Sequence, residues 1–145
     1  MIAYTDGGSR GNPGPAGFGV RVEDGHGALV EEWHGSIGVA TNNVAEYRGL
    51  ISALRWAVDR GAPQLEIRSD SELLVKQMRG EYRVKNPGLR PLFEEARALA
   101  ARVGRVRYTH VRREMNAEAD RLANEAMDEA GGRPTADGRR LTADD

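Results

Sequence analysis

The chain has 145 residues, carries a net charge of −1 at pH 7 and contains no cysteine. This length favours one domain with a real hydrophobic core. The lack of cysteine excludes disulfides, thiolate zinc sites and cysteine nucleophiles. Near-neutral charge gives no global attraction to nucleic acid, so any such contact must come from a local patch. No apolar run approaches the roughly 20 residues of a membrane span, and no signal peptide is recognisable, so we expect a soluble, cytoplasmic protein without membrane contact.

The first 40 residues predict three short strands joined by turns. Residues 2–6 form a strand that a run rich in glycine and proline, residues 7–15, is expected to end. Residues 18–22 alternate apolar with polar or small side chains, and residues 29–37 form a third strand after a turn at 24–27. Short connections between successive strands favour an antiparallel meander.

Beyond residue 43 the pattern changes to helices that alternate with strands. Apolar residues recur at helical spacing from 44 to 58, and a glycine and a proline soon after end that helix. The elements expected next are a strand at 65–68, helices at 71–79 and 89–103, a strand at 106–111 and a helix at 116–130. This order predicts an α/β fold with a mixed five-stranded sheet, three strands antiparallel and then two parallel, flanked by helices.

The last residues differ in composition from the rest of the chain. From residue 131 onward the chain is rich in Gly, Arg, Pro, Thr and Asp and has few side chains to bury. We therefore expect one domain over residues 1–130, followed by a disordered tail or linker over residues 131–145.

Four acidic residues stand where such a fold could bring them together: Asp6, Glu46, Asp70 and Asp120. Asp6 and Asp70 end neighbouring candidate strands, whereas Glu46 and Asp120 lie near the starts of candidate helices. Four carboxylates at one point repel one another and need about four positive charges to remain ionised. Two divalent cations supply that charge, and such a site is suited to phosphoryl transfer.

Each acid also has a simpler interpretation. Asp6 could start a turn, and Glu46 could complete a capping box with Asn43. Asp70 and Asp120 could simply favour the positive end of a helix dipole. Glu46, however, shares a helix face with apolar residues, where a buried acid needs a partner. The four positions together favour one site, because ligands of open α/β sheets bind outside the carboxyl ends of the strands.

Five short segments occur together in the order typical of one enzyme family. They are Asp-Gly-Gly-Ser at 6–9, Gly-Asn-Pro-Gly-Pro-Ala-Gly-Phe-Gly at 11–19, Thr-Asn-Asn-Val-Ala-Glu at 41–46, Ser-Asp-Ser at 69–71 and Asn-Ala-Glu-Ala-Asp-Arg-Leu-Ala-Asn at 116–124. With these segments the chain resembles type 1 ribonuclease H over about residues 1–130. The resemblance implies a ribonuclease-H-like fold and an endonuclease that hydrolyses the RNA strand of RNA–DNA hybrids, leaving 3′-hydroxyl and 5′-phosphate ends.

The resemblance also implies a role for each of the four acids, which match the family's catalytic, metal-binding residues. Two Mg²⁺ ions are implied, with Mn²⁺ as a substitute. Asp6 would bridge both ions, and Asp120 would help to hold the ion that activates water. Glu46 and Asp70 would hold the ion at the leaving 3′-oxygen. The family's contacts with the hybrid fall at Asn12, Thr41, Asn42, Asn43 and Glu72.

Two segments depart from the better-known bacterial members. The basic protrusion rich in Lys and Trp is reduced to residues 82–88, as in archaeal and some actinobacterial members. The loop at 112–115 lacks the histidine that the bacterial members carry. Arg113 and Glu114 could assist there, Arg113 by neutralising phosphate charge and Glu114 by promoting product departure. Their simpler interpretation is that both are solvated loop charges.

Other functions on the same fold stay open at this point. One is a non-catalytic module that binds hybrids or RNA, although clustered acids would repel phosphates in a pure binder. Another is a nuclease of the same superfamily that acts on DNA, although the segment at 41–43 favours recognition of a hybrid. Cleavage of double-stranded RNA is also left open. We expect a monomer, and the short-loop form is compatible with fusion to a further C-terminal domain.

Overall fold

The structure is a computed structural model that describes residues 1–132. Its strands are β1 (Ile2–Ser9), β2 (Gly14–Glu23), β3 (Leu29–Ala40), β4 (Gln64–Ser69) and β5 (Arg105–His110). They form one sheet in the order β3-β2-β1-β4-β5. β1, β2 and β3 pair antiparallel, whereas β4 pairs parallel with both β1 and β5. The predicted mixed five-stranded sheet is confirmed.

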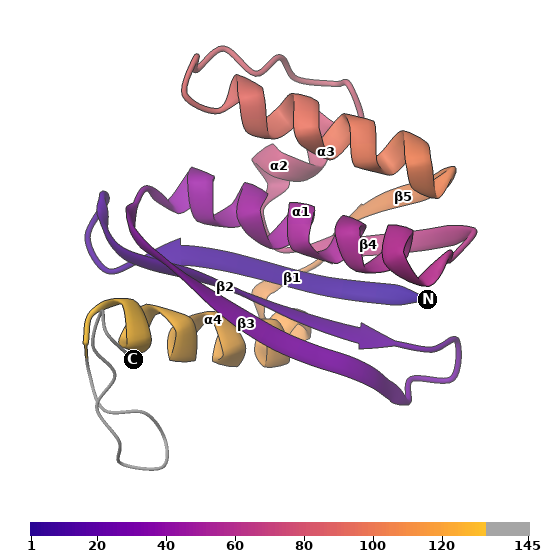
Figure 1. The fold of residues 1–145 in the computed structure, drawn as a ribbon, viewed down its shortest axis with the longest axis horizontal. Helices are drawn as coiled ribbons and strands as arrows, with labels where there is room; N and C mark the ends of the chain where they lie inside the picture. The colour runs from indigo at the N-terminus through magenta and orange to yellow at the C-terminus, as the bar shows by residue number, and fades with distance from the viewer. Residues whose placement is uncertain (133–145) are drawn as a thin grey trace.

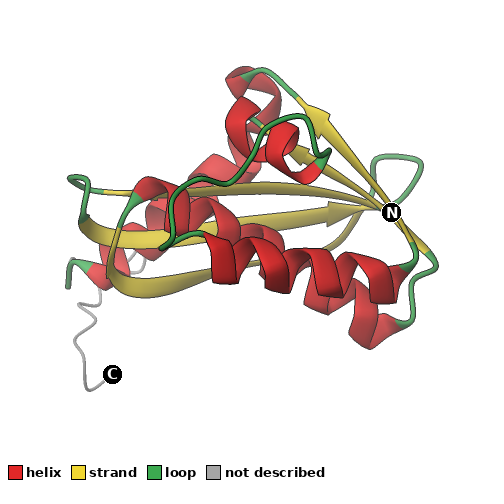
Figure 2. Ribbon diagram, turned by 90° about the horizontal axis from the view of Figure 1, so that it is seen from above, coloured by secondary structure: helices red, strands yellow, loops and turns green. Residues whose placement is uncertain are grey.

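Helices cover both faces of this sheet. They are α1 (Asn42–Arg60), α2 (Glu72–Met78), α3 (Arg90–Val103) and α4 (Ala117–Ala130), with a 3₁₀ turn, η1 (Arg113–Asn116), before α4. α1, α2 and α3 lie on one side of the sheet and α4 on the other (Figure 1). The long loop between α2 and α3 runs over the outer side of the helical layer (Figure 2). Within residues 1–132 no helix is long and apolar enough to cross a membrane.

Residues 7–9 and 14–15 of the run rich in glycine and proline belong to strands, which corrects the loop expected at residues 7–15, whereas residues 10–13 form the loop. β1 continues into this run and β2 begins within it. A Cβ atom on Gly7 would lie 2.4 Å from the backbone of Ala45 in α1. On the other face, a Cβ atom on Gly17 would lie 2.4 Å from the Cβ atom of Ala126 in α4. Both helices therefore approach the sheet closely because these strand positions have no side chain.

Helix α1 buries the face that carries Glu46. Thr41 caps it, because its Oγ1 accepts a hydrogen bond from Val44 N at 3.3 Å. Asn43, the cap expected from a capping box, lies inside the helix instead. Leu50, one turn after Glu46, has no exposed surface, and truncating it to alanine would cost about 2–5 kcal/mol. The face with Glu46 therefore packs toward the sheet, as its apolar spacing predicts.

Helix α4 begins at Ala117, one residue later than expected, because the 3₁₀ turn occupies the preceding residues. It packs on β2, β3 and β1. Gly131 and Gly132 follow its last turn. The rest of the expected tail, residues 133–145, lies outside the described residues, so that expectation stays a prediction.

Candidate active site

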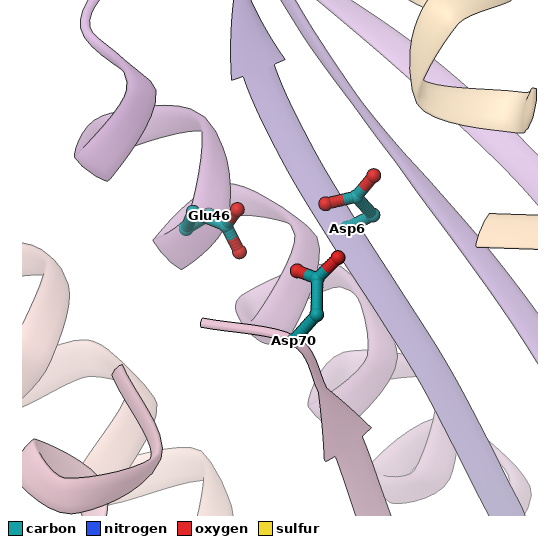
Figure 3. A group of neighbouring side chains, drawn as sticks. All are labelled: Asp6, Glu46 and Asp70. Atoms are coloured by element: carbon teal, nitrogen blue, oxygen red, sulfur yellow. The ribbon is translucent and has the colours of Figure 1, made fainter. Parts of the chain in front are cut away.

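Three carboxylates meet at one end of the sheet. Asp6 comes from β1, Asp70 directly follows β4, and Glu46 lies near the start of α1. Oxygen atoms of the three side chains lie within 4.8 Å of one another. Figure 3 shows the three carboxyl groups around a common space. Asp6 lies inside β1, opposite Gly19 of β2, which corrects its expected place at a strand end.

The local fold explains this convergence. β1 and β4 pair in parallel, and their last paired residues are Thr5 and Ser69. The next residue of each strand is an aspartate, so two carboxylates leave the sheet side by side. A Cβ atom on Gly7 would lie 2.6 Å from the backbone nitrogen of Glu46. Glycine at this position therefore lets α1 bring its glutamate to the same end of the sheet.

Electrostatic repulsion and burial act together on these acids. Burial raises the pKa of Asp6 from 3.8 to about 8, and the charge of Asp70 and the neighbouring Asp120 carboxyl add to this effect. Burial also raises the pKa of Glu46 well above its usual value, with further contributions from Asp6 and Asp70. Burial is also the main reason why the pKa of Asp70 is raised. Within residues 1–132 none of the three carboxylates forms an ion pair with a basic side chain.

The donor atoms fit a hard divalent cation. Glu46 is partly exposed as a residue, yet its Oε2 atom is buried and has no hydrogen-bond partner within residues 1–132. A buried carboxylate oxygen without a partner costs free energy unless a cation or proton neutralises it. All the available ligands are oxygen atoms, which suit Mg²⁺ or Mn²⁺. Asp6, Glu46 and Asp70 could therefore hold such an ion.

The fourth predicted acid lies next to this group and outside it. Asp120 is exposed in the first turn of α4 and is absent from the set of three carboxylates within 4.8 Å. Its carboxyl group lies close enough to that of Asp6 to raise the pKa of Asp6, and its charge also raises the pKa of Asp70. The structure thus brings three of the four acids together and puts the fourth beside them.

Hydrogen bonds link some of the predicted substrate residues at the start of α1. The backbone nitrogen of Asn42 donates to Asn12 Oδ1 at 3.0 Å. Asn42 Oδ1 in turn accepts hydrogen bonds from the backbone nitrogen and the hydroxyl group of Ser9, at 2.8 and 3.1 Å. Thr41 is the helix cap, and Asn43 is exposed in the first turn. Asn12 and Asn42 are thus held in place by hydrogen bonds, and Asn42 lies about one turn before Glu46 in α1.

Glu72 and the loop before α4 have different surroundings. Glu72 begins α2 and forms an ion pair with Lys76 at 2.8 Å. Arg113 lies close enough to Asp70 for its positive charge to lower the pKa of that acid, against the larger effect of burial. Glu114 instead lines a shallow cavity that Tyr4 also lines. Of the two loop residues, Arg113 is the one whose charge acts on a carboxylate of the site.

Sequence reasoning missed one residue of the site, Asn116. It has no exposed surface, and its Nδ2 atom donates to the backbone oxygen of Thr5 at 3.0 Å. Its side chain also lies close enough to Asp70 to lower the pKa of that carboxyl group. An asparagine before a helix is usually a cap, and nothing in the local sequence indicates a contact with a residue 111 positions away.

The fold and the carboxylate group together define a ribonuclease-H-like domain. Residues 4–126 match the family described as reverse transcriptase-like. The structure superposes with a TM-score of 0.84 on RNase H1 of Halobacterium salinarum, at 47% identity over 88% of this chain and 97% of that one. The chain belongs to the type 1 ribonuclease H family, in the short-loop form of its archaeal and actinobacterial members.

Two further similarities bear on the size and substrate of the relatives. The bifunctional protein Rv2228c of Mycobacterium tuberculosis is 49% identical over 138 residues, which are 94% of this chain and 38% of that protein. This chain therefore spans less than half the length of that relative. LC11-RNase H1, solved in complex with an RNA/DNA hybrid, matches with a TM-score of 0.84 and 47% identity over 89% of this chain and 97% of its own.

Proposed function

We propose that this chain hydrolyses the RNA strand of RNA–DNA hybrids. The observation that carries the proposal is the group of three carboxylates within 4.8 Å, one of which has a buried oxygen atom without a partner. Membership of the ribonuclease H family and the hybrid complex of LC11-RNase H1 support the same substrate. A site that concentrates negative charge suits a reaction in which cations draw a phosphodiester to it.

The acids would act as the ligands of two Mg²⁺ ions, with Mn²⁺ as a substitute. Asp6 would bridge the two ions, with Glu46 and Asp70 on one side and Asp120 on the other. When bound, the ions supply charge neutralisation at the phosphate and a more acidic water. The influence of Asp120 on the pKa of Asp6 shows that the two carboxyl groups are neighbours, which favours a role for both at the same site. The expected products carry 3′-hydroxyl and 5′-phosphate ends.

The residues before α1 would recognise the hybrid. Asn12, Asn42 and Asn43 offer amide groups that can bond sugar hydroxyl groups, including the 2′-hydroxyl that distinguishes RNA from DNA. Thr41 lies at the N-terminus of a helix, where a phosphate is favoured. Glu72 would contact the hybrid from α2. Because Asn12 and Asn42 already bond each other, little ordering would be needed on binding.

The direct test is cleavage of a labelled RNA–DNA hybrid beside double-stranded DNA and double-stranded RNA of the same sequence. We expect cleavage of the RNA strand of the hybrid in Mg²⁺ or Mn²⁺, and none in excess chelator. Cleavage products that a ligase can rejoin without further treatment would support the expected 3′-hydroxyl and 5′-phosphate ends. Tight hybrid binding without cleavage would favour the binding module, and cleavage of DNA alone would favour a DNA nuclease.

We infer that this domain acts as a monomer and can form part of a longer protein. The length of the mycobacterial relative supports the second point. Light scattering of the purified chain tests the first, and a mass near twice 15.8 kDa would contradict it.

A further inference from the structure

Asn116 lies where the pairing of β1 and β4 ends. Thr5 is the last residue of β1 that pairs with β4, and its carbonyl oxygen accepts the hydrogen bond from Asn116. Asp70 is the first residue after β4, and the same side chain lies close enough to its carboxylate to lower the pKa of that acid. One buried amide thus spans the gap that opens between the two strands. Thr5 O belongs to the peptide bond that leads into Asp6, so the amide bears on both aspartates.

The orientation of this amide is set by its partners. The Nδ2 atom of Asn116 donates to Thr5 O, and the nearby carboxylate of Asp70 is also an acceptor, so the NH₂ group faces this side. A flipped side chain would set its carbonyl oxygen against two acceptors. The Oδ1 atom is left buried and without a partner within the described residues. An unsatisfied buried acceptor costs free energy, so the side chain is poorly suited to a purely stabilising role.

Asn116 also forgoes the role that its position would favour. It directly precedes α4, yet its side chain makes no capping hydrogen bond to that helix. Asparagine is among the residues that most favour this position as a helix cap. The side chain is used instead to connect α4 to β1 and to the end of β4. Asp120 lies one turn further along the same helix, so the connection also bears on the position of the fourth acid.

We propose that Asn116 is a positioning residue that sets the separation of Asp6 and Asp70 and orients the Asp70 carboxylate toward a divalent cation. The inference rests on the proposed function only in assigning the site to hybrid cleavage. Groups that hold metal ligands from outside commonly change metal affinity or activity 10- to 100-fold when removed. A residue that only joins α4 to the sheet would change stability alone.

The test compares Asn116→Ala and Asn116→Ser with a control, Ser52→Ala. The control removes the acceptor of a 2.7 Å hydrogen bond from Trp33 Nε1, so it also costs one partly buried hydrogen bond, six residues beyond Glu46 in α1. Calorimetry measures Mn²⁺ affinity without hybrid, and steady-state kinetics separate kcat from KM. For both Asn116 variants we expect Mn²⁺ affinity at least fivefold weaker, kcat at least tenfold lower and KM within threefold of wild type. For the control we expect all three within twofold.

A lower melting temperature with unchanged Mn²⁺ affinity and kcat in the Asn116 variants would overturn the inference. Should neither variant fold, the wild-type protein still gives an answer. When Mg²⁺ is added, the side-chain amide signal of Asn116 in a ¹⁵N spectrum should shift over the concentration range in which the protein binds the metal. The signal of exposed Asn86, in the loop between α2 and α3, should not shift. An unmoved Asn116 signal would refute the role. If wild type binds Mn²⁺ but cleaves no hybrid, the proposed function fails while the metal measurements still test Asn116.

Discussion

The two ends of helix α4 carry acids in opposite electrostatic settings. In its C-terminal half, Glu125 and Glu129 flank His34 of β3 at 3.4 and 2.7 Å, and Asp128 pairs with Arg10. At its N-terminal end, Asp120 faces Asp6 and adds negative charge to acids that form no ion pair within residues 1–132. Acids that have basic partners stabilise the fold, whereas buried acids without such partners destabilise it. Balanced charge needs no further explanation, whereas unbalanced, buried charge indicates a cation site.

The largest expected effect is at the unbalanced end. Asp70→Asn keeps the shape of the side chain and removes one ligand charge, so the fold should survive while hybrid cleavage falls about 1,000-fold or more, equivalent to about 4 kcal/mol of barrier. Initial rates at saturating Mg²⁺ measure the effect, and circular dichroism checks the fold. Glu129→Gln, at the balanced end, is the matched control and should keep its rate within twofold. Near-wild-type cleavage by Asp70→Asn would remove the basis for the metal site.

The second effect is on the stability of the metal-free protein. Because the pKa of Asp6 is raised from 3.8 to about 8, its contribution to stability is fully present below pH 4 and is lost as the pH rises toward 8. Asp6→Asn removes this penalty, so at pH 8 in chelator the variant should be more stable than wild type by roughly 1–3 kcal/mol. Near pH 4 the two proteins should be equally stable.

Urea unfolding at both pH values measures the difference. Saturating Mg²⁺ should stabilise wild type more than the variant at pH 8, since the ion replaces the missing positive charge. If the difference in unfolding free energy between the two proteins stays constant from pH 4 to pH 8, the pKa of Asp6 is not raised in the folded protein.

The third effect concerns Arg113, a basic side chain whose charge lowers the pKa of Asp70. Arg113→Ala should lower kcat roughly tenfold with little change in hybrid affinity, since a positive charge beside the developing phosphate charge is lost. Its loss also removes an influence that lowers the pKa of Asp70, so the acidic limb of the pH–rate profile should move to higher pH. Arg112→Ala, one residue away, is the control. Equal profiles for all three proteins would leave Arg113 a solvated loop charge.

The sequence contains much of the fold and part of the site. Alternation followed by helical spacing predicts which segments are strands and which are helices. Two candidate strands that each lead to an aspartate predict that Asp6 and Asp70 lie side by side. These signals are local, so they can be read along the chain. The approach of Glu46 depends on a glycine of β1 against the backbone of α1. The same glycines suggest a loop in the sequence, because their packing role is visible only once both helices are in position.

Asn116 shows the limit of such reasoning. Its partners, Thr5 and Asp70, are distant in the chain and lie at the ends of two strands. A side chain that forgoes a local cap for such contacts leaves no periodic signal. The exposed position of Asp120, outside the group of three carboxylates, likewise depends on how α4 crosses the sheet.

The smallest expected effect is at the balanced end of α4. Glu129→Gln removes the carboxylate in contact with His34 Nε2, which forms an ion pair only when His34 is protonated, while Glu125 still lies 3.4 Å from His34 Nδ1. The side chains of His34 and Glu129 are about one quarter exposed, so solvent screens the pair and the loss should be less than about 1 kcal/mol. Thermal unfolding in low salt and in 1 M salt measures it, and the difference from wild type should shrink in high salt. A loss of several kcal/mol, or a drop in hybrid cleavage, would mean that the two ends of the helix do not divide structure from function, since charge at the far end would then also support the site.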